Sequence, residues 1–418
     1  MHTALPTRVG RALLGLSLLI ATTASAQWTS QRPPAGMFSL TDVHFTDADH
    51  GYASAAIGGL TKTVNGGQTW VDIPTGVPSS LRDVFFVTPD SGYVVGNAGV
   101  IIRTVDGGQT WQRRDLANNG SSVNGVYAHN ANRALVTQGD EIYRTTDGGA
   151  TWNVVYTYNG PLNIFTFRFL EFTSAEIGYA VGGYSGSFGN VSQVVKTTDG
   201  GLTWQLLTSL AGSVPMGGAA AVAFPNPQTG YVADVQDRLF KTTDGGQTWN
   251  IVAQRSFGGL YGMHFTDAQT GYGVGFNGNL RSTTDGGQTW TDQSLNQVDT
   301  YAAVYFPNPQ VGYAVGSDAG AAARVLKYTA QATGTAKANS LTGVSVFPNP
   351  AQNMVKLSGL PAGLPTQATV YGADGRRVLS TALAPGQSQL PTASLAAGLY
   401  VLRLESGGRS YQQKLAIE

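Results

Sequence analysis

Short apolar segments alternate with turn-forming residues along most of the chain, and this pattern predicts β-strands. Segments such as "DVHF" (42–45) and "DVFF" (83–86) carry an apolar residue at every second position, the period of a strand with one buried face. Each is followed by a turn rich in Asp, Asn, Pro or Gly, and then by a strand that resembles "GYAVG". This succession predicts an all-β protein.

A repeated unit organises these strands. Six near-copies of one motif, each ending in tryptophan, follow one another at spacings of 41, 41, 52, 45 and 41 residues. A period near 41 suits four short strands, which is the length of one propeller blade. A Gly-Tyr pair recurs between the motifs, with "RAL" (133–135) in its place once, and it marks seven units. The motif copies are "TVNGGQTW" (63–70), "TVDGGQTW" (104–111), "TTDGGATW" (145–152), "TTDGGLTW" (197–204) and "TTDGGQTW" (242–249 and 283–290).

The seventh unit, "VGYAVGSDAGAAARVLKYTA" (311–330), has no tryptophan motif after it. The segment "QWTSQRPPAG" (27–36) resembles the tryptophan-led strands of the other units. We therefore expect a seven-bladed β-propeller over residues 27–328, in which the strand containing Trp28 closes the ring. Pairing this strand with the last unit would cover a sheet edge that otherwise promotes aggregation.

The two ends of the chain follow other patterns. Residues 1–26 have a basic start with Arg8 and Arg11, a short apolar run and the small residues "ASA" (24–26), as a signal peptide has, so we expect cleavage after Ala26. Residues 329–340 are small and polar, typical of a linker. Residues 341–418 include "YVLRLE" and "QKLAIE", whose alternation predicts a small Ig-like β-sandwich.

Composition narrows the class of protein. The chain has no cysteine, a formal net charge of zero and only 12% charged residues, which argues against thiol chemistry and against a nucleic-acid partner. No segment after residue 26 has 18 consecutive apolar residues, so we expect no transmembrane segment in the mature chain. No His pattern of a metal site occurs. We expect a monomer without a metal or another cofactor.

The tryptophan motif itself predicts a scaffold element. The carboxylate of Asp106 can accept hydrogen bonds from its own turn, Gly107 and Gly108 permit positive φ, and Trp111 can bury a large apolar surface. In the first copy, Asn65 keeps the acceptor oxygen but loses the charge that acid–base catalysis would need. We therefore assign structural roles and no catalytic residue. The structural residues are Asn65, Trp70, Asp106, Trp111, Asp147, Trp152, Asp199, Trp204, Asp244, Trp249, Asp285 and Trp290.

The six copies resemble the Asp-box of bacterial neuraminidase (BNR) repeats, and the fuller unit over 27–328 resembles the photosystem II stability/assembly factor family. That resemblance implies a non-catalytic propeller that binds protein partners. The segments "VFPNPAQNMVKLSG", "GLYVLRLESGG" and "KLAIE" resemble the C-terminal sorting domain of type IX secretion substrates. This second resemblance implies recognition of residues 341–418 by the type IX machinery and an extracellular or cell-surface location.

Three long connections depart from the repeat: 153–169, 182–193 and 208–221. Since they would share the face opposite the "DGG" turns, we predict a binding rim for a peptide, a protein or a glycan. Neutral loop growth explains the extra length equally well. The residues available for contact are Tyr156, Tyr158, Phe165, Arg168, Tyr184 and Phe188.

The alternative function is a glycoside hydrolase of the sialidase or xyloglucanase type. Asp42 and Asp83 occupy equivalent strand positions, and two carboxylates could act together on a glycosidic bond. Capping of the strand start explains this pair better, since Asn124 stands at the position in the third unit. A basic residue also precedes most of the motifs, as Lys62 and Arg103 do, and we interpret these as solvated strand-end charges.

Overall fold

The computed structural model describes most of the chain. The described residues are 27–33, 36–116, 120–159, 165–186, 189–207, 218–254, 258–295, 299–330, 341, 344–361, 363–372, 377–407 and 409–418. One compact unit spans Ala26–Ala330, and a second contains Gln331–Glu418. Within the described ranges, no helix is long and apolar enough to cross a lipid bilayer. The all-β prediction is confirmed.

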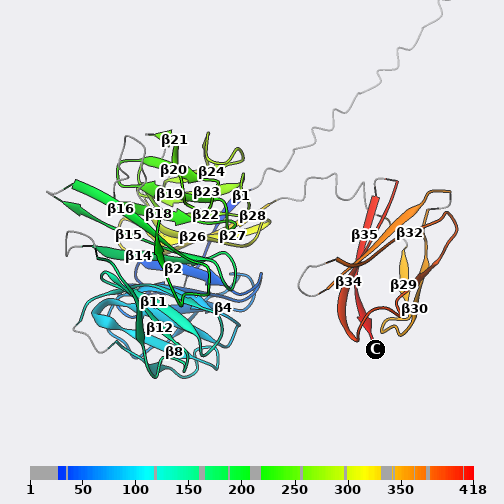
Figure 1. The fold of residues 1–418 in the computed structure, drawn as a ribbon, viewed down its shortest axis with the longest axis horizontal. Coiled ribbons are helices and arrows are strands. Elements are labelled where there is room, and N and C mark those ends of the chain that lie inside the picture. The colour runs from blue at the N-terminus through cyan, green and yellow to red at the C-terminus, as the bar shows by residue number, and fades with distance from the viewer. Residues whose placement is uncertain are drawn as a thin grey trace, which may run out of the picture. The chain divides into compact units, whose positions relative to one another are not determined.

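The first unit consists of seven four-stranded antiparallel sheets, coloured from blue to yellow in Figure 1 and numbered here along the chain. Sheet 1 contains β2 (Leu40–Phe45), β3 (Gly51–Ala55), β4 (Leu60–Thr63) and β5 (Val71–Ile73). Sheet 2 contains β6 (Leu81–Phe86), β7 (Gly92–Gly96), β8 (Ile101–Thr104) and β9 (Gln112–Arg113), with a short 3-10 helix, η1 (Asn97–Gly99), between β7 and β8. Sheet 3 contains β10 (Val123–Ala128), β11 (Ala134–Gln138), β12 (Glu141–Thr145) and β13 (Asn153–Thr157).

The remaining sheets follow the same order. Sheet 4 contains β14 (Thr166–Phe172), β15 (Gly178–Gly186), β16 (Gly189–Thr197) and β17 (Gln205–Leu206). Sheet 5 contains β18 (Ala219–Ala223), β19 (Gly230–Asp234), β20 (Arg238–Thr242) and β21 (Asn250–Gln254). Sheet 6 contains β22 (Leu260–Phe265), β23 (Gly271–Gly275), β24 (Leu280–Thr283) and β25 (Thr291–Asp292). Sheet 7 contains β26 (Thr300–Asn308), β27 (Val311–Ser317), β28 (Ala323–Thr329) and β1 (Gln27–Gln31).

Sheet 7 is the only one of these seven that takes a strand from elsewhere in the sequence. β1 pairs with β28, and Trp28 lies opposite Tyr328. The Trp28 side chain is 3% exposed and packs edge-on against Phe306, with ring centroids 5.9 Å apart. An aromatic anchor and a strand edge therefore both hold the segment that begins at Gln27.

The recurring Gly-Tyr pair joins a sheet to the next one wherever it occurs. The ring of Tyr52 in sheet 1 stacks on Phe86 in sheet 2, and its hydroxyl donates to the Pro89 carbonyl at 2.6 Å. Gly51 leaves room for the ring of Phe45, since a Cβ there would lie 2.4 Å from that ring. Tyr313 of sheet 7 stacks in the same way on Phe45 of sheet 1, with centroids 3.8 Å apart.

The turn of the tryptophan motif is held by its own polar side chains. In the copy of sheet 2, Asp106 accepts hydrogen bonds from the Thr104 hydroxyl at 2.7 Å and from the Thr110 N–H at 2.9 Å. Gly107 and Gly108 have φ of 71° and 88°, the left-handed region that glycine adopts without strain. Asn65 accepts the corresponding bond from the Thr69 N–H at 2.9 Å. We call the face formed by these turns the hairpin face.

Trp28 and Trp70 are buried, and the other five tryptophans are half-buried and pack against the apolar clusters of the sheets. The basic residues before the motifs are more than solvated charges. Lys62 donates to the Gly107 carbonyl of the next sheet at 3.2 Å, and Lys327 donates to the Gly66 carbonyl at 2.6 Å. These side chains bind neighbouring sheets together.

The second unit contains two sheets that share one apolar core. One sheet has the order β32-β31-β34-β35 and the other β29-β30-β33. Leu402, Leu404 and Leu415 are fully buried between them. The strands are β29 (Ser345–Phe347), β30 (Met354–Ser358), β31 (Thr366–Tyr371), β32 (Arg377–Leu383), β33 (Gln389–Pro391), β34 (Gly398–Ser406) and β35 (Arg409–Ile417).

Candidate binding site

The first strand of every sheet in the first unit carries a register shift near its start, at the second residue in five sheets and at the third in β14 and β26. In sheet 2 the shift lies between Leu81 and Asp83, so Arg82 has no partner in the ladder with β7. Gly96 permits this geometry, since a Cβ there would lie 2.3 Å from the Ser80 carbonyl oxygen. Bulges of this kind re-aim a side chain. The bulged residues are Thr41, Arg82, Asn124, Arg168, Ala220, Tyr261 and Ala302.

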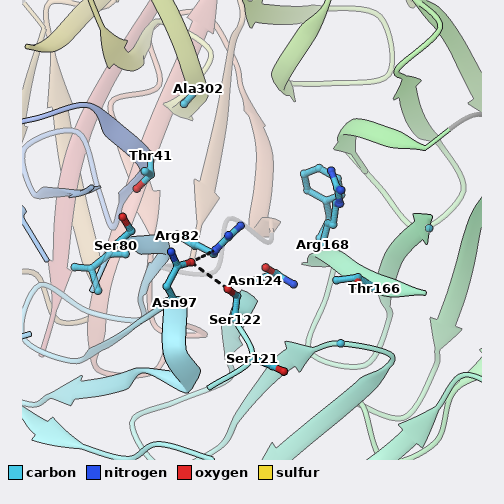
Figure 2. Close-up of a pocket in the computed structure, with 14 residues that line it drawn as sticks. Thr41, Ser80, Arg82, Asn97, Ser121, Ser122, Asn124, Thr166, Arg168 and Ala302 are labelled. Carbon is cyan, nitrogen blue, oxygen red and sulfur yellow. Dashed lines mark hydrogen bonds between the residues drawn. The ribbon is translucent and has the colours of Figure 1, made fainter. Parts of the chain in front are cut away.

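Most of these bulged residues gather at one cavity on the face opposite the hairpin face. Arg82, Asn124 and Arg168 come from sheets 2, 3 and 4 and line a cavity of about 1020 Å³ together with hydroxyl and amide side chains. Figure 2 shows Asn124 between the two arginines. The polar lining residues include Thr41, Ser80, Asn97, Ser121, Ser122 and Thr166. We call this cavity the mouth.

The mouth carries two positive charges without acidic partners. Both arginine side chains are exposed, and neither forms an ion pair in the described part of the chain. The Arg82 Nε donates to Asn97 Oδ1 at 2.5 Å, which holds the guanidinium in place (Figure 2). Partial desolvation at the cavity wall, and then the charge of Arg168, lower the pKa of Arg82. The mouth is therefore a cationic site, and an anionic group bound there would relieve the repulsion between the two guanidiniums.

A second cavity, of about 550 Å³, lies below the mouth and is lined by the first strands of all seven sheets. Asp42 and Asp83 are hydrogen-bonded to each other here. Asp42 also accepts from the Val84 N–H at 3.1 Å, and Asp83 accepts from the Val126 N–H at 2.7 Å. Each carboxylate thus bonds the next sheet. Burial raises the pKa of Asp42, and burial with the Asp42 charge raises that of Asp83 well above its usual range.

Other titratable groups face the same cavity. Burial raises the pKa of Glu171 to about 7, and its carboxylate accepts from the Phe224 N–H of sheet 5 at 3.1 Å. Burial, with repulsion from His264, lowers the pKa of His44 to about 3, and burial lowers that of His264 to about 4. Both imidazoles are therefore neutral near pH 7. Among the described residues, no group of three or more His, Asp or Glu side chains is arranged to hold a metal ion.

The residues of the predicted rim have different positions in the structure. Arg168 lines the mouth. Phe165 is 3% exposed and stacks on Tyr158 with centroids 4.0 Å apart, so its ring belongs to the core of sheets 3 and 4. Tyr156 packs against the same core. Tyr184 lies in β15, and Phe188 lies outside the described residues.

Comparisons with known proteins identify both units. Residues 20–157 and 71–182 match the family model for the photosynthesis system II assembly factor YCF48, and residues 345–418 match the model for a secretion system C-terminal sorting domain. The first unit therefore resembles YCF48, and the second unit contains a secretion sorting domain. No curated protein matches it.

Solved structures agree with the YCF48-type fold. A structure of YCF48 bound to a D1 peptide is 21% identical, with a TM-score of 0.59 over 73% of this chain and 97% of that chain. YCF48 from Cyanidioschyzon merolae is 22% identical, with a TM-score of 0.59 over 73% and 99% of the two chains. The WD40 repeats of RRP9 share only 11% identity at a TM-score of 0.57, over 74% of this chain and 99% of that chain. At these identities the likeness establishes a β-propeller fold and leaves the ligand open.

The sequence identified Arg168 but did not join it to Arg82. The signal was present near the start of the first strands, where Thr41, Arg82, Asn124 and Arg168 differ while the residue before each of them is always apolar. Variation at one position of an otherwise regular repeat marks this candidate site. The sorting domain indicates export by the type IX system to the cell surface or the extracellular space.

Proposed function

We propose that the chain is an exported, non-catalytic binding protein whose YCF48-type propeller holds an anionic segment of a peptide or protein at the mouth. The observation that carries this proposal is the pair of exposed guanidiniums, Arg82 and Arg168, which face one cavity without an acidic partner among the described residues. Guanidinium groups bind carboxylates through paired, charge-assisted hydrogen bonds. The surrounding Ser, Thr and Asn side chains can bond the backbone of such a segment.

The solved relative supports a peptide rather than a glycan as the ligand, since that YCF48 was solved with a D1 peptide. A protein with a similar fold therefore binds a peptide, and the mouth of this chain has the size and the charge to do so. In this proposal, the anionic group is a chain-terminal carboxylate or an Asp or Glu side chain.

The proposed architecture is a closed ring of seven blades. Contacts from each sheet to the next support it, including the Tyr313–Phe45 stack and the Lys327–Gly66 bond between sheets 7 and 1. The pairing of β1 with β28 supports closure by the segment that holds Trp28. The second unit, residues 341–418, would be the Ig-like sorting domain. Cleavage after Ala26 remains our proposal for the leader, and the intact mass of the exported protein would test it.

A glycoside hydrolase is the second candidate, and the geometry of the carboxylates argues against it. Retaining and inverting enzymes keep their two carboxyl groups about 5 Å and about 6.5–9.5 Å apart, with the sugar between them. Asp42 and Asp83 instead bond directly to each other and to backbone N–H groups of the next sheet. This arrangement matches an inter-sheet joint. Sustained turnover of a glycoside panel by wild type and its loss in Asp83→Asn would reverse this conclusion.

The binding proposal is tested with the exported chain and a fluorescent hexapeptide library. One library carries a free C-terminal carboxylate and internal Asp or Glu, and a matched library is amidated and uncharged. We expect the anionic library alone to bind, and the double variant Arg82→Ala/Arg168→Ala to bind it at least about tenfold more weakly. Arg113→Ala removes an exposed arginine that does not line the mouth and should leave binding unchanged. Equal binding of both libraries, or no effect of the double variant, would contradict the proposal.

A further inference from the structure

A third cavity lies beside the mouth, on the same face, and differs from it in chemistry. It has a volume of about 610 Å³ and lies between the turn after β3, the loop after β5 and the segment before β2. Its side walls include Met37, Phe38, Ile57, Ile73 and Val77, and Asp72 is the one charged residue among those that line it. We call this cavity the groove.

Two large apolar side chains stand in solvent at the edge of the groove. Phe38 is 52% exposed and Ile57 is 60% exposed. Ile57 also has φ of 62°, a left-handed conformation that is unfavourable for a β-branched residue. At the corresponding turns of sheets 5 and 6 the chain places Asp237 and Asn277, whose short polar side chains tolerate this conformation. The left-handed backbone at Ile57 therefore lowers the stability of the folded chain, and this cost points to a contact between the exposed side chain and another molecule.

The walls of the groove are fixed by hydrogen bonds and close packing. The Thr75 hydroxyl donates to the Gly58 carbonyl at 2.7 Å, and a Cβ at Gly58 would lie 1.6 Å from the Val77 carbonyl oxygen. Phe38 forms a backbone bridge with Ala322 of sheet 7. The groove therefore exists before any ligand arrives, which limits the entropy lost on binding.

The groove and the mouth share one wall. Pro78 lines the groove, Ser80 lines the mouth two residues later, and the Ile57 N–H donates to the Ser80 hydroxyl oxygen at 3.4 Å. An extended segment of a few residues could therefore reach both cavities. Charge sets the direction of this segment, with its anionic part at the mouth and its apolar part in the groove. The mouth presents two guanidiniums, whereas the groove presents apolar side chains with one carboxylate.

We propose that the groove binds a branched aliphatic side chain, Leu, Ile or Val, of the same peptide whose anionic group the mouth holds. This inference rests on the proposed function and adds to it the specificity of the site. The partner is a peptide or an extended protein end that has an acidic group and, a few residues away, a bulky aliphatic residue. Phe38 and Ile57 cover that side chain and exclude water from it.

The test uses the exported chain and a positional-scanning hexapeptide library with a free C-terminal carboxylate. We expect one position at which Leu, Ile or Val mixtures bind about tenfold more tightly than Ser mixtures, the gain that burial of an aliphatic side chain brings. Phe38→Ser and Ile57→Asn should each abolish that preference while the dependence on the carboxylate remains. Phe276→Ser removes a matched aromatic ring, 51% exposed and outside both cavities, and should retain the preference.

Thermal melts separate this outcome from misfolding. Ile57→Asn should melt at or above the wild-type temperature because Asn suits positive φ, so its loss of preference would reflect a lost contact. The groove inference is overturned if wild-type binding depends on the acidic group of the peptide but shows no aliphatic preference. It is also overturned if the preference persists in both variants. Either result leaves the mouth proposal intact. If wild-type binding does not depend on the acidic group of the peptide, the mouth proposal itself is overturned. Self-association that disappears in Phe38→Ser would assign the groove to a second copy of the chain and overturn the inference.

Discussion

The two faces of the propeller use the repeat in opposite ways. On the hairpin face, the same contacts recur from sheet to sheet, as in the bonds that Asp106 and Asp285 accept from their own turns. On the mouth face, equivalent positions differ, so that Thr41, Arg82 and Arg168 occupy the same place in three strands. The comparison teaches that this chain repeats stabilising contacts on one face and varies its side chains on the other, the face where we propose that recognition takes place, as on many rigid scaffolds.

The largest effect that would sharpen this comparison is expected at Trp28. Trp28→Ala removes a buried ring that packs on Phe306 and anchors β1, so we expect a loss of about 3–5 kcal/mol in the free energy of unfolding. Trp249→Ala, at a half-buried tryptophan, should cost clearly less. Urea unfolding of both variants gives the comparison. Equal losses would mean that β1 has no special role in holding sheet 7.

A smaller effect is expected at Glu171 in the cavity below the mouth, and this effect depends on pH. Burial raises the pKa of Glu171 to about 7 in the folded chain, above its unfolded value, so the folded state binds a proton that the unfolded state releases. The contribution of Glu171 is therefore fully present below about pH 4.5 and is lost as the pH rises through 7. Glu171→Gln should remove this part of the decline in unfolding free energy between pH 4.5 and 7.5.

Unfolding curves at several pH values check this expectation for Glu171. Asp42 and Asp83, whose pKa values burial also raises, contribute a decline of the same sign in both proteins, so the difference between wild type and variant isolates Glu171. Glu176→Gln, at an exposed carboxylate in the turn between β14 and β15, serves as the control. A wild-type decline that persists unchanged in Glu171→Gln would contradict the assigned pKa.

The smallest effect is expected in a single turn of the hairpin face. Asp285→Ala removes the acceptor of the Thr283 and Thr289 bonds, whereas Asp285→Asn keeps one acceptor oxygen as Asn65 does. The alanine variant should therefore melt below the asparagine variant, and neither should change peptide binding. The Thr289 hydroxyl lowers the pKa of Asp285 to about 2, so its contribution is present above about pH 4 and is lost as the pH falls toward 2. Melts at pH 7 and pH 2.5 test both statements; equal melting temperatures at pH 7 would refute the first.

Much of the scaffold could be predicted from the sequence because its causes are local. Alternating residues predict the strands, and a carboxylate followed by two glycines predicts a turn that bonds itself. The depth of the tryptophans could not be predicted in the same way, because burial depends on the packing of the neighbouring sheet. Trp28 and Trp70 are buried whereas Trp111 is half-buried, although the neighbouring residues in the sequence are similar.

The sequence by itself determined the all-β class, the repeat, the turns and the sorting domain, since each follows from spacing and residue type within a few positions. Only the tertiary structure decided the candidate site. Arg82 and Arg168 are 86 residues apart, and the bulge that aims Arg82 depends on backbone pairing that no local pattern reveals. The groove likewise needs Phe38 and Ile57 from two connections to meet. Sites built between repeats are long-range contacts, and only the packed sheets bring their residues together.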